Sequence, residues 1–296
     1  MQARLALAWP TTWEEYALLD SGDGSRLERF GPYTVARPEP HALWRRALPE
    51  REWQKAHARF ERFSDLPEGQ GQWLKERPIE EPWTMRYGDL RFHARLTPFK
   101  HTGLFPEQAV NWEWCADLIR RRGTPRVLNL FGYTGLATLS AAAAGAQVTH
   151  VDASRPAMTW ARENQRLSNL DDKPIRWLIE DAMKFVRREV RRGSQYDGVI
   201  LDPPAFGRGP KGEIWRFSEA TPEILAEVAK ILTPRPLFVL INAYAVSDSA
   251  TVLYNMLAEI TGPFGGELEA GELALKEQSG GRLLSTSIFA RWRSRD

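Results

Sequence analysis

The stretch YDGVILDPPAFGRGPKG, residues 196–212, carries residue types well suited to chemistry. A short apolar run ends at Asp202, and Pro203 and Pro204 follow at once. Two prolines fix the backbone and remove N–H groups that would compete for the exposed carbonyls. Outward-facing acceptors of this kind suit an amine, and the ring of Phe206 can stack on a planar group such as a nucleobase. The alternative is a rigid turn that only ends a strand.

A second group of candidate residues lies earlier in the chain, where glycines and acids follow apolar runs. Gly132 and Gly135 in the stretch NLFGYTG let the backbone approach a ligand closely. Asp152 and Asp181 end the next two runs, where carboxylates can accept hydrogen bonds from a ribose diol and from an adenine amine. The spacing is not G-x-G-x-x-G, so a pyrophosphate cradle is not indicated. The alternative is a tight turn with acids that only cap helices.

The elements that position these residues alternate between strand and helix from residue 126 onward. Strands are predicted over 126–131, 147–151, 175–179, 198–201 and 237–241, and a terminal hairpin over 267–276 and 282–291. Helices are predicted over 136–144, 156–167, 182–192, 218–232 and 249–259. This pattern predicts an α/β fold with a doubly wound, mostly parallel sheet of about seven strands over residues 98–296.

The first part of the chain differs in pattern. Strand signals over 16–24, 26–30 and 33–36, and a hairpin over 83–96, predict a small β-rich module at residues 1–97. Most of the twelve tryptophans lie before residue 120, where they can fill a small core or stack on bases. We expect this module to contribute to substrate recognition, and a helix over 107–122 to join it to the α/β domain.

Residues 100–245 resemble the class I S-adenosylmethionine-dependent methyltransferases, most closely the bacterial 23S rRNA methyltransferases with a C-terminal catalytic domain of this type. The resemblance lies in the combination of HTGLFPEQ at 101–108, NLFGYTG at 129–135, VDAS at 151–154, EDA at 180–182 and DPPAF at 202–206. It implies a Rossmann-like methyltransferase fold with S-adenosylmethionine as the cofactor. Relatives often carry Asp where this chain has Glu107.

The resemblance also assigns residues to the site. The implied cofactor-binding residues are His101, Thr102, Phe105, Gln108, Asn129, Phe131, Gly132, Tyr133, Thr134, Gly135, Asp152, Ala153, Ser154 and Asp181. The implied catalytic residues are Asp202, Pro203, Pro204 and Phe206. Asp202 would lie beside the sulfonium, where it and the Pro203 carbonyl would accept the hydrogens of an exocyclic amine and localise its lone pair. Catalysis of such an in-line displacement rests mostly on positioning.

Cysteine usage and composition narrow the function further. Cys115 is the only cysteine, so a disulfide framework and a cysteine-based zinc site are excluded, and no metal is predicted. Methylation at carbon 5 of a pyrimidine normally needs a thiolate, and no cysteine follows the fourth or fifth strand, so nitrogen is the expected acceptor. No apolar run approaches the roughly 20 residues of a membrane span. The apolar stretch at the start of the sequence is too short for a secretory signal. Both observations indicate a soluble, cytoplasmic protein.

The sequence therefore predicts methylation of a base nitrogen in RNA, with rRNA as the expected partner. The net charge of +2 does not by itself demand a polyanion, although arginines cluster at 120–122, 187–192 and 291–295. Three alternatives stay open: a protein or small-molecule N-methyltransferase that uses the same loop, a dinucleotide oxidoreductase, and a non-catalytic RNA-binding module.

Overall fold

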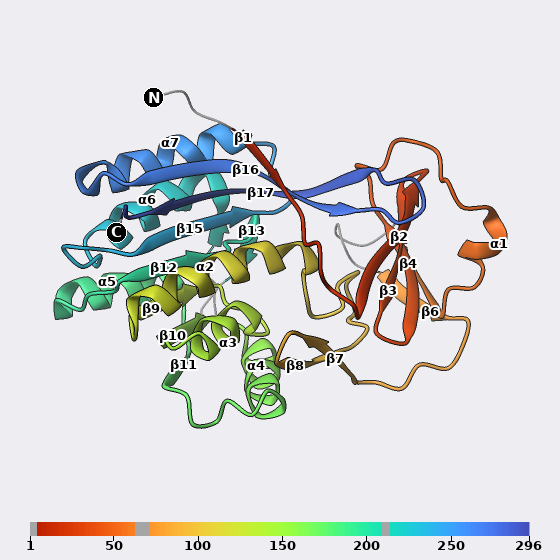
Figure 1. Cartoon of the computed structure of the whole chain (residues 1–296), viewed down its shortest axis with the longest axis horizontal. Helices are drawn as coiled ribbons and strands as arrows, with labels where there is room; N and C mark the ends of the chain where they lie inside the picture. The colour runs from red at the N-terminus through yellow and green to blue at the C-terminus, as the bar shows by residue number, and fades with distance from the viewer. Residues whose placement is uncertain (1–4, 63–70, 209–213, 296) are drawn as a thin grey trace. The chain divides into compact units, whose positions relative to one another are not determined.

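The computed structural model describes residues 5–62, 71–208 and 214–295 (Figure 1). Its contacts group into two compact units. The sheet unit comprises Met1–Ala8, Val110–Leu273 and Thr286–Asp296, and the β-rich unit comprises Trp9–Ala109 and Ala274–Ser285. The module predicted over 1–97 and the domain predicted over 98–296 remain proposals about independently folding parts, and residues 1–4 and 63–70 of that module lie outside the described range.

The sheet unit is built on eight strands in the order β1-β16-β17-β15-β12-β9-β10-β11. The central parallel strands are β9 (Arg126–Leu130), β10 (Gln147–Asp152), β11 (Ile175–Ile179), β12 (Gly198–Leu201) and β15 (Phe238–Ala243). The outer strands are β17 (Leu283–Arg293), antiparallel to β15, then β16 (Glu267–Lys276) and β1 (Leu5–Ala8). Strand order reverses between β9 and β12, which creates the crevice where α/β proteins bind ligands.

Helices cover both faces of this sheet, because strand side chains alternate between two apolar cores. On one face, Leu128, Val199 and Val239 pack with α5 (Ala182–Arg192), α6 (Phe217–Ala229) and α7 (Ala250–Thr261). On the other, the adjacent residues Val127, Ile200 and Leu240 pack with α2 (Ala109–Arg122) and α3 (Leu136–Ala143). A further helix, α4 (Arg155–Leu167), follows β10. The predicted doubly wound fold is confirmed.

The sheet contains one strand more than the predicted seven. Leu5–Ala8 pairs in parallel with Ala270–Leu273 of β16 at the edge of the sheet. Its sequence, LALA, is short, and Leu5 and Leu7 stay exposed, so it carries neither a polar alternation nor a turn signal. Within the described residues, no helix is long and apolar enough to cross a membrane.

The β-rich unit contains a five-stranded sheet, a separate two-stranded hairpin and a short helix. The sheet runs β2 (Tyr16–Gly22), β3 (Ser25–Phe30), β4 (Tyr33–Pro38), β5 (Ala58–Arg62) and β6 (Gly71–Lys75). The hairpin is β7 (Trp83–Tyr87) with β8 (Leu90–Ala94), and the helix is α1 (Glu50–Trp53). The β-rich character is confirmed, and β5, β6 and α1 are additions that the sequence did not predict.

Half of the six tryptophans of the β-rich unit are buried in its interior. Trp53 and Trp83 are buried, and the indole N–H of Trp53 donates to Asp20 at 2.9 Å. The same carboxylate accepts from the Ser279 hydroxyl, 2.7 Å away, in the turn between β16 and β17. In that turn, the buried carboxylate of Glu277 accepts hydrogen bonds from Ser21 and Arg282. These bonds fix the turn to β2.

Candidate active site

The turn between β9 and α3 has an unusual backbone. Phe131 and Tyr133 adopt positive φ angles of 59° and 49°, and Gly135 has a φ of 86°. Left-handed conformations at residues other than glycine cost free energy and persist where the surrounding structure fixes them, often at ligand sites. The Gly132 N–H donates to the Val151 carbonyl at 3.2 Å, which ties the turn to β10. The turn is therefore held in a strained form at the crevice.

Behind the turn lies a buried polar chain that the sequence did not predict. The Asn129 amide donates to the Thr138 hydroxyl at 2.9 Å, and that hydroxyl lies 2.9 Å from His150 Nδ1. A β-carbon placed on Gly132 would lie 2.3 Å from His150 Cε1, far inside van der Waals contact. Glycine is required here because of the imidazole behind it. The side chain of Asn129, a residue expected to bind the cofactor, is already hydrogen-bonded to Thr138 within this buried row of polar groups.

Asp152 connects the turn to the end of β10. Its two carboxylate oxygens accept the backbone N–H groups of Tyr133 at 2.8 Å and Ser154 at 2.7 Å. Burial raises the pKa of this carboxyl, and the two N–H bonds oppose that rise. A carboxylate has about four acceptor positions, so it can also accept hydrogens from a ribose diol. Ser154 caps α4, because its hydroxyl accepts the N–H of Ala157.

Asp181 has the capping role that we kept as the alternative for the acids. Its Oδ1 accepts the N–H of Lys184 at 2.9 Å and begins α5. The neighbouring Glu180 N–H donates to the Asp152 carbonyl at 3.1 Å, so the ends of β10 and β11 are linked. The predicted contact of Asp181 with adenine remains a proposal.

We expect Asp152→Ala to weaken S-adenosylmethionine binding by about 1–3 kcal/mol, because the variant loses a partly buried acceptor and the anchor of Tyr133. Calorimetric titration measures this directly. Asp171→Ala, at an exposed aspartate in the loop after α4, is the matched control and should bind like the parent. Equal affinities in all three proteins would show that Asp152 does not contact the cofactor.

The Asp202 loop lies beside the glycine turn. The Asp202 N–H donates to the Leu130 carbonyl at 3.4 Å, which places it at the carboxyl end of β9. Trp215, in β14 (Ile214–Arg216), donates its indole N–H to the Pro204 carbonyl at 2.8 Å. Its ring also meets that of Phe131 edge-on, with centroids 4.8 Å apart. The loop is thus fixed by Trp215, a residue that the sequence analysis missed.

Phe206 lies just beyond this loop, in β13 (Phe206–Arg208), which pairs with β14. Its side chain is 57 % exposed, an unusual exposure for a phenylalanine in a paired strand. Pro203 is buried and Pro204 is exposed. The pair of strands therefore presents an aromatic face to solvent a few residues from Asp202.

The segment predicted to cover the cofactor, 101–108, belongs to the β-rich unit. The rings of His101 and Phe105 lie 5.1 Å apart, Thr102 is fully buried, and Gln108 ends a 3₁₀ turn over Pro106–Gln108. Burial lowers the pKa of His101 to about 3, so its imidazole is neutral. The contact of these four residues with the cofactor remains a prediction.

The structure therefore brings together the residues predicted on β9, β10 and β12. Asp152 contacts the glycine turn, and Asp202 lies at the adjoining strand end. Four residues that the sequence did not predict hold this group in place through hydrogen bonds: Thr138, His150, Trp215 and Asn164. The Asn164 amide, for example, donates to the Thr134 carbonyl at 3.0 Å. No sequence motif joins these residues, because each lies on a different helix or strand.

The buried imidazole of His150 predicts a loss of stability in acid. Burial lowers its pKa from 6.5 to about 3, so the folded protein keeps it neutral while the unfolded chain takes up a proton below pH 6.5. Its contribution is complete above that pH and is lost as the pH falls. At about pH 5.5 we expect the free energy of unfolding to drop by about 1.4 kcal/mol from this group alone.

Urea unfolding at about pH 7.5 and 5.5 measures this drop. His150→Gln should show a smaller drop than the parent, because glutamine takes up no proton. His41→Gln, at an exposed histidine, should keep the parental drop. If all three proteins lose the same free energy, His150 is not the group responsible.

Comparison with known proteins identifies the family. The S-adenosylmethionine-dependent methyltransferase family matches residues 50–257. The chain belongs to this family. Its cofactor is S-adenosylmethionine, and the strained turn with Asp152 at the crevice fits that group. The alternatives of an oxidoreductase and of a non-catalytic module are not supported.

Individual relatives agree with this assignment. A solved S-adenosylmethionine-dependent methyltransferase from Agrobacterium tumefaciens is 43% identical, with a TM-score of 0.91 over 100% of this chain and 97% of that one. The methyltransferase is also 34% identical over 168 residues to the ribosomal RNA large subunit methyltransferase K/L of Shewanella sp. (strain ANA-3), which covers 56% of this chain and 23% of that protein. It thus spans about a quarter of the length of such curated relatives.

More distant structures share the fold alone. SMU.776, a putative methyltransferase solved with S-adenosylhomocysteine, is 17% identical with a TM-score of 0.69, over 95% of this chain and 76% of that one. Over the described parts of this methyltransferase, no group of three or more His, Cys, Asp or Glu side chains is arranged to hold a metal ion.

Proposed function

We propose that this methyltransferase transfers a methyl group to a nitrogen atom of a base in RNA, with ribosomal RNA as the substrate. The observation that carries the proposal is the exposed ring of Phe206 beside the acceptor loop at Asp202. An aromatic face next to outward-facing acceptors suits a base that is stacked and hydrogen-bonded by its exocyclic amine. The names of curated relatives such as the Shewanella enzyme support ribosomal RNA.

In the proposed mechanism, bound S-adenosylmethionine supplies an electrophilic methyl group on its sulfonium. The glycine turn would hold its methionine part, and the Asp152 carboxylate would accept hydrogen bonds from its ribose hydroxyls. The Asp202 carboxylate and the Pro203 carbonyl would accept hydrogen bonds from the two hydrogens of the target amine, which localises the nitrogen lone pair. As the nitrogen takes the methyl group, the sulfonium would become a neutral thioether, and one amine proton would pass to the Asp202 carboxylate. Trp215 fixes the loop through the Pro204 carbonyl, which keeps these acceptors in place during transfer.

The position of Cys115 supports nitrogen as the acceptor. This residue, the only cysteine of the chain, is buried in α2 among Leu118, Ile119 and other apolar side chains. Burial raises the pKa of its thiol, so it does not form a thiolate readily. An enzyme that methylates carbon 5 of a pyrimidine would need a reactive thiolate at the site.

Transfer of a tritiated methyl group tests the proposal. Deproteinised rRNA, separated ribosomal proteins and intact subunits are offered in parallel, and the labelled RNA is digested to nucleosides for mass spectrometry. We expect the label in one N-methylated nucleoside. Label confined to protein would favour the alternative of a protein N-methyltransferase, in which the same loop seats a side-chain amide.

Phe206 provides the discriminating variant. Phe206→Ala should weaken RNA binding by about 1–3 kcal/mol through lost stacking, and Phe206→Tyr should retain it. A side-chain amide does not stack in this way, so a protein substrate would be affected much less.

We also propose that the β-rich region over 1–97 contributes to substrate recognition. Three of its six tryptophans, Trp13, Trp53 and Trp83, are buried, so this contribution must come from residues at its surface. Exchange of the exposed residues on β5 and β6 (Glu61, Arg62, Gln72 and Lys75) should then change the KM for RNA with little change in kcat.

A further inference from the structure

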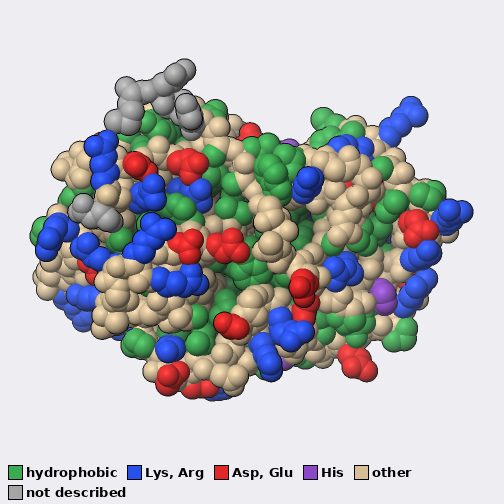
Figure 2. Space-filling model, viewed as in Figure 1, with side chains coloured by type: hydrophobic (Ala, Val, Ile, Leu, Met, Phe, Trp, Pro, Cys, Tyr) green, Lys and Arg blue, Asp and Glu red, His purple; other side chains and the backbone are tan. Residues whose placement is uncertain are grey.

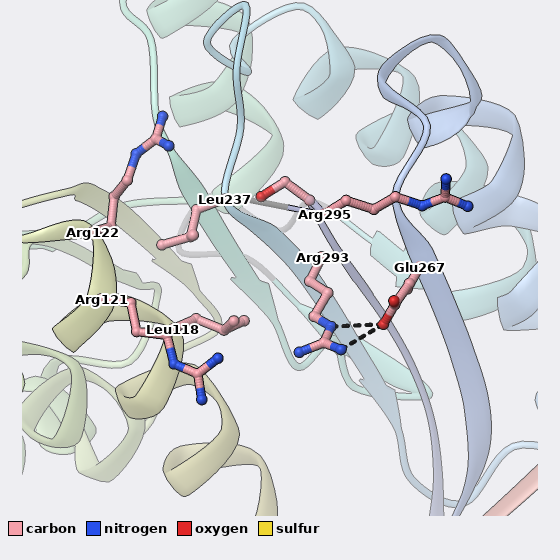
Figure 3. A pocket seen from close by; sticks show the side chains of 8 residues that line it. Leu118, Arg121, Arg122, Leu237, Glu267, Arg293 and Arg295 are labelled. Carbon is pink, nitrogen blue, oxygen red and sulfur yellow. Dashed lines mark hydrogen bonds and ion pairs between the residues drawn. The ribbon is translucent and has the colours of Figure 1, made fainter.

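A hollow of about 340 Å³ lies on the sheet unit, and Figure 3 shows the side chains that line it. Its walls include Arg121 and Arg122 from α2, Leu237 before β15, Glu267 at the start of β16, and Arg293 and Arg295 at the end of the chain. Phe238, the first residue of β15, pairs with Arg293. The hollow is therefore at the amino ends of the parallel strands, the edge opposite to Asp152 and Asp202.

The charges around the hollow are unbalanced. Four arginines line it against one carboxylate, Glu267, which accepts from Arg293 Nε at 2.9 Å and Nη2 at 2.5 Å. Figure 3 shows this pair facing one another, with Leu237 between Arg122 and Arg295. Among the described residues, neither Arg121 nor Arg295 forms an ion pair. Crowded guanidinium groups repel one another unless an anion joins them.

Helix stability explains only part of this cluster. Arg121 and Arg122 lie in the last turn of α2, where cations interact favourably with the helix dipole, and Arg122 Nη2 donates to the Arg235 carbonyl at 3.1 Å. That reason does not apply to Arg293 and Arg295, which lie on or after the last strand. In addition, the buried hydroxyl of Ser294 in the wall has no hydrogen-bond partner within the described range. An unsatisfied buried hydroxyl costs free energy until an acceptor reaches it.

We infer that this hollow binds phosphate groups of the RNA backbone outside the target nucleotide. The inference rests on the proposed function. Arginine presents a planar fork that matches phosphate oxygens, and all four cations here are arginines. The apolar floor of Leu118 and Leu237 can pack against a ribose. Figure 2 shows Lys and Arg side chains gathered over the end of this unit where Figure 1 places the C-terminus.

The placement of the hollow sets a minimum size for the substrate. The central strands separate the two edges, and the six residues of β15 span on the order of 20 Å. An RNA that reaches from the Asp202 loop to the arginines must extend at least that far. We therefore expect the affinity for a fragment of a few nucleotides to be independent of the arginines. The affinity for a long fragment should depend on them.

Fluorescence anisotropy with a labelled RNA transcript of about 40 nucleotides tests the inference. The double variant Arg121→Gln/Arg295→Gln should raise the Kd by roughly 10-fold. The slope of log K against log salt should fall by about 1.4, since two phosphate contacts on a single strand are lost. Binding of an oligonucleotide of about four nucleotides should not change.

Glu267→Gln gives a result of the opposite sign. Removing this carboxylate frees Arg293, so RNA binding should tighten several-fold, an outcome that damage to the fold does not produce. Arg191→Gln removes one exposed charge in the last turn of α5, outside the hollow, and should leave binding within about 2-fold. An equal loss in Arg191→Gln and in the double variant would show diffuse attraction and overturn the site.

The remaining outcomes separate this inference from the proposed function. If the parent binds and methylates RNA but the double variant is unchanged, the site is wrong and the function stands. If the parent binds RNA through the arginines but methylates only protein, the site stands and the function is wrong. If the parent does not bind RNA, both are overturned.

Discussion

Replacing Asp202 with alanine should lower the rate of methyl transfer by roughly 100-fold or more, with S-adenosylmethionine still bound. In the proposed mechanism the Asp202 carboxylate accepts a hydrogen bond from the target amine, and two hydrogen bonds to backbone carbonyls hold the loop in place. The Asp202 N–H to the Leu130 carbonyl and the Trp215 bond to the Pro204 carbonyl both survive the change. Single-turnover methylation on rRNA, with calorimetric titration of the cofactor, measures the two effects separately.

Asp202→Asn is the matched control, because it keeps an oxygen acceptor of the same length. Its rate should lie between those of the parent and the alanine variant. All three proteins should melt at similar temperatures. A fully active alanine variant would exclude Asp202 from the chemistry, and an equal loss in both variants would point to the negative charge in place of the acceptor.

Gly132→Ala should damage both stability and cofactor binding, although it adds a single methyl group. That methyl would overlap the His150 ring at 2.3 Å, and the ring is held by Thr138 and packed on Trp177 at 4.6 Å between centroids. The backbone of the turn must move instead. We expect a loss of about 1–3 kcal/mol in the free energy of unfolding and a clear rise in the Kd for S-adenosylmethionine.

Gly262→Ala is a suitable control, since no atom lies within 4 Å of the added methyl and its φ is −48°. A second test places Gly132→Ala in a His150→Ala background, where the methyl group has room. The penalty should shrink there. An undiminished penalty would show that the steric overlap with His150 is not its cause.

The sequence predicted the sheet unit well because its strands carry strong and repeated signals. Continuous apolar runs such as that ending at Asp202, each followed by a helical pattern, fix both the element type and the parallel pairing. Strand β1 was not predicted, because it has only four residues and two of them are exposed leucines. Strands β5 and β6 were not predicted, because polar and charged residues interrupt their apolar pattern.

The candidate site was predictable only where residues follow strand ends. Asp152 and Asp202 are of this kind, and the structure places both at the crevice. The supporting residues depend on contacts across the fold: His150 on Thr138 across 12 positions, and Trp215 on Pro204 across 11. No local pattern encodes such pairs. The role of Asp181 as a helix cap was predictable as an alternative, and the hydrogen bond to Lys184 shows it.

The way the chain passes between the two units bears on how the β-rich unit can be exchanged between relatives. An N-terminal segment cannot be transplanted as a cassette, because its first strand, β1, completes the large sheet. If this chain receives the N-terminal segment of a relative, it keeps its own turn between β16 and β17 but loses its own β2. The buried carboxylate of Glu277 would then lose the Ser21 hydroxyl, and Arg282 would lose Asp20. A working chimera therefore needs residues 9–109 and 274–285 from the same parent, and its recipient needs its own β1.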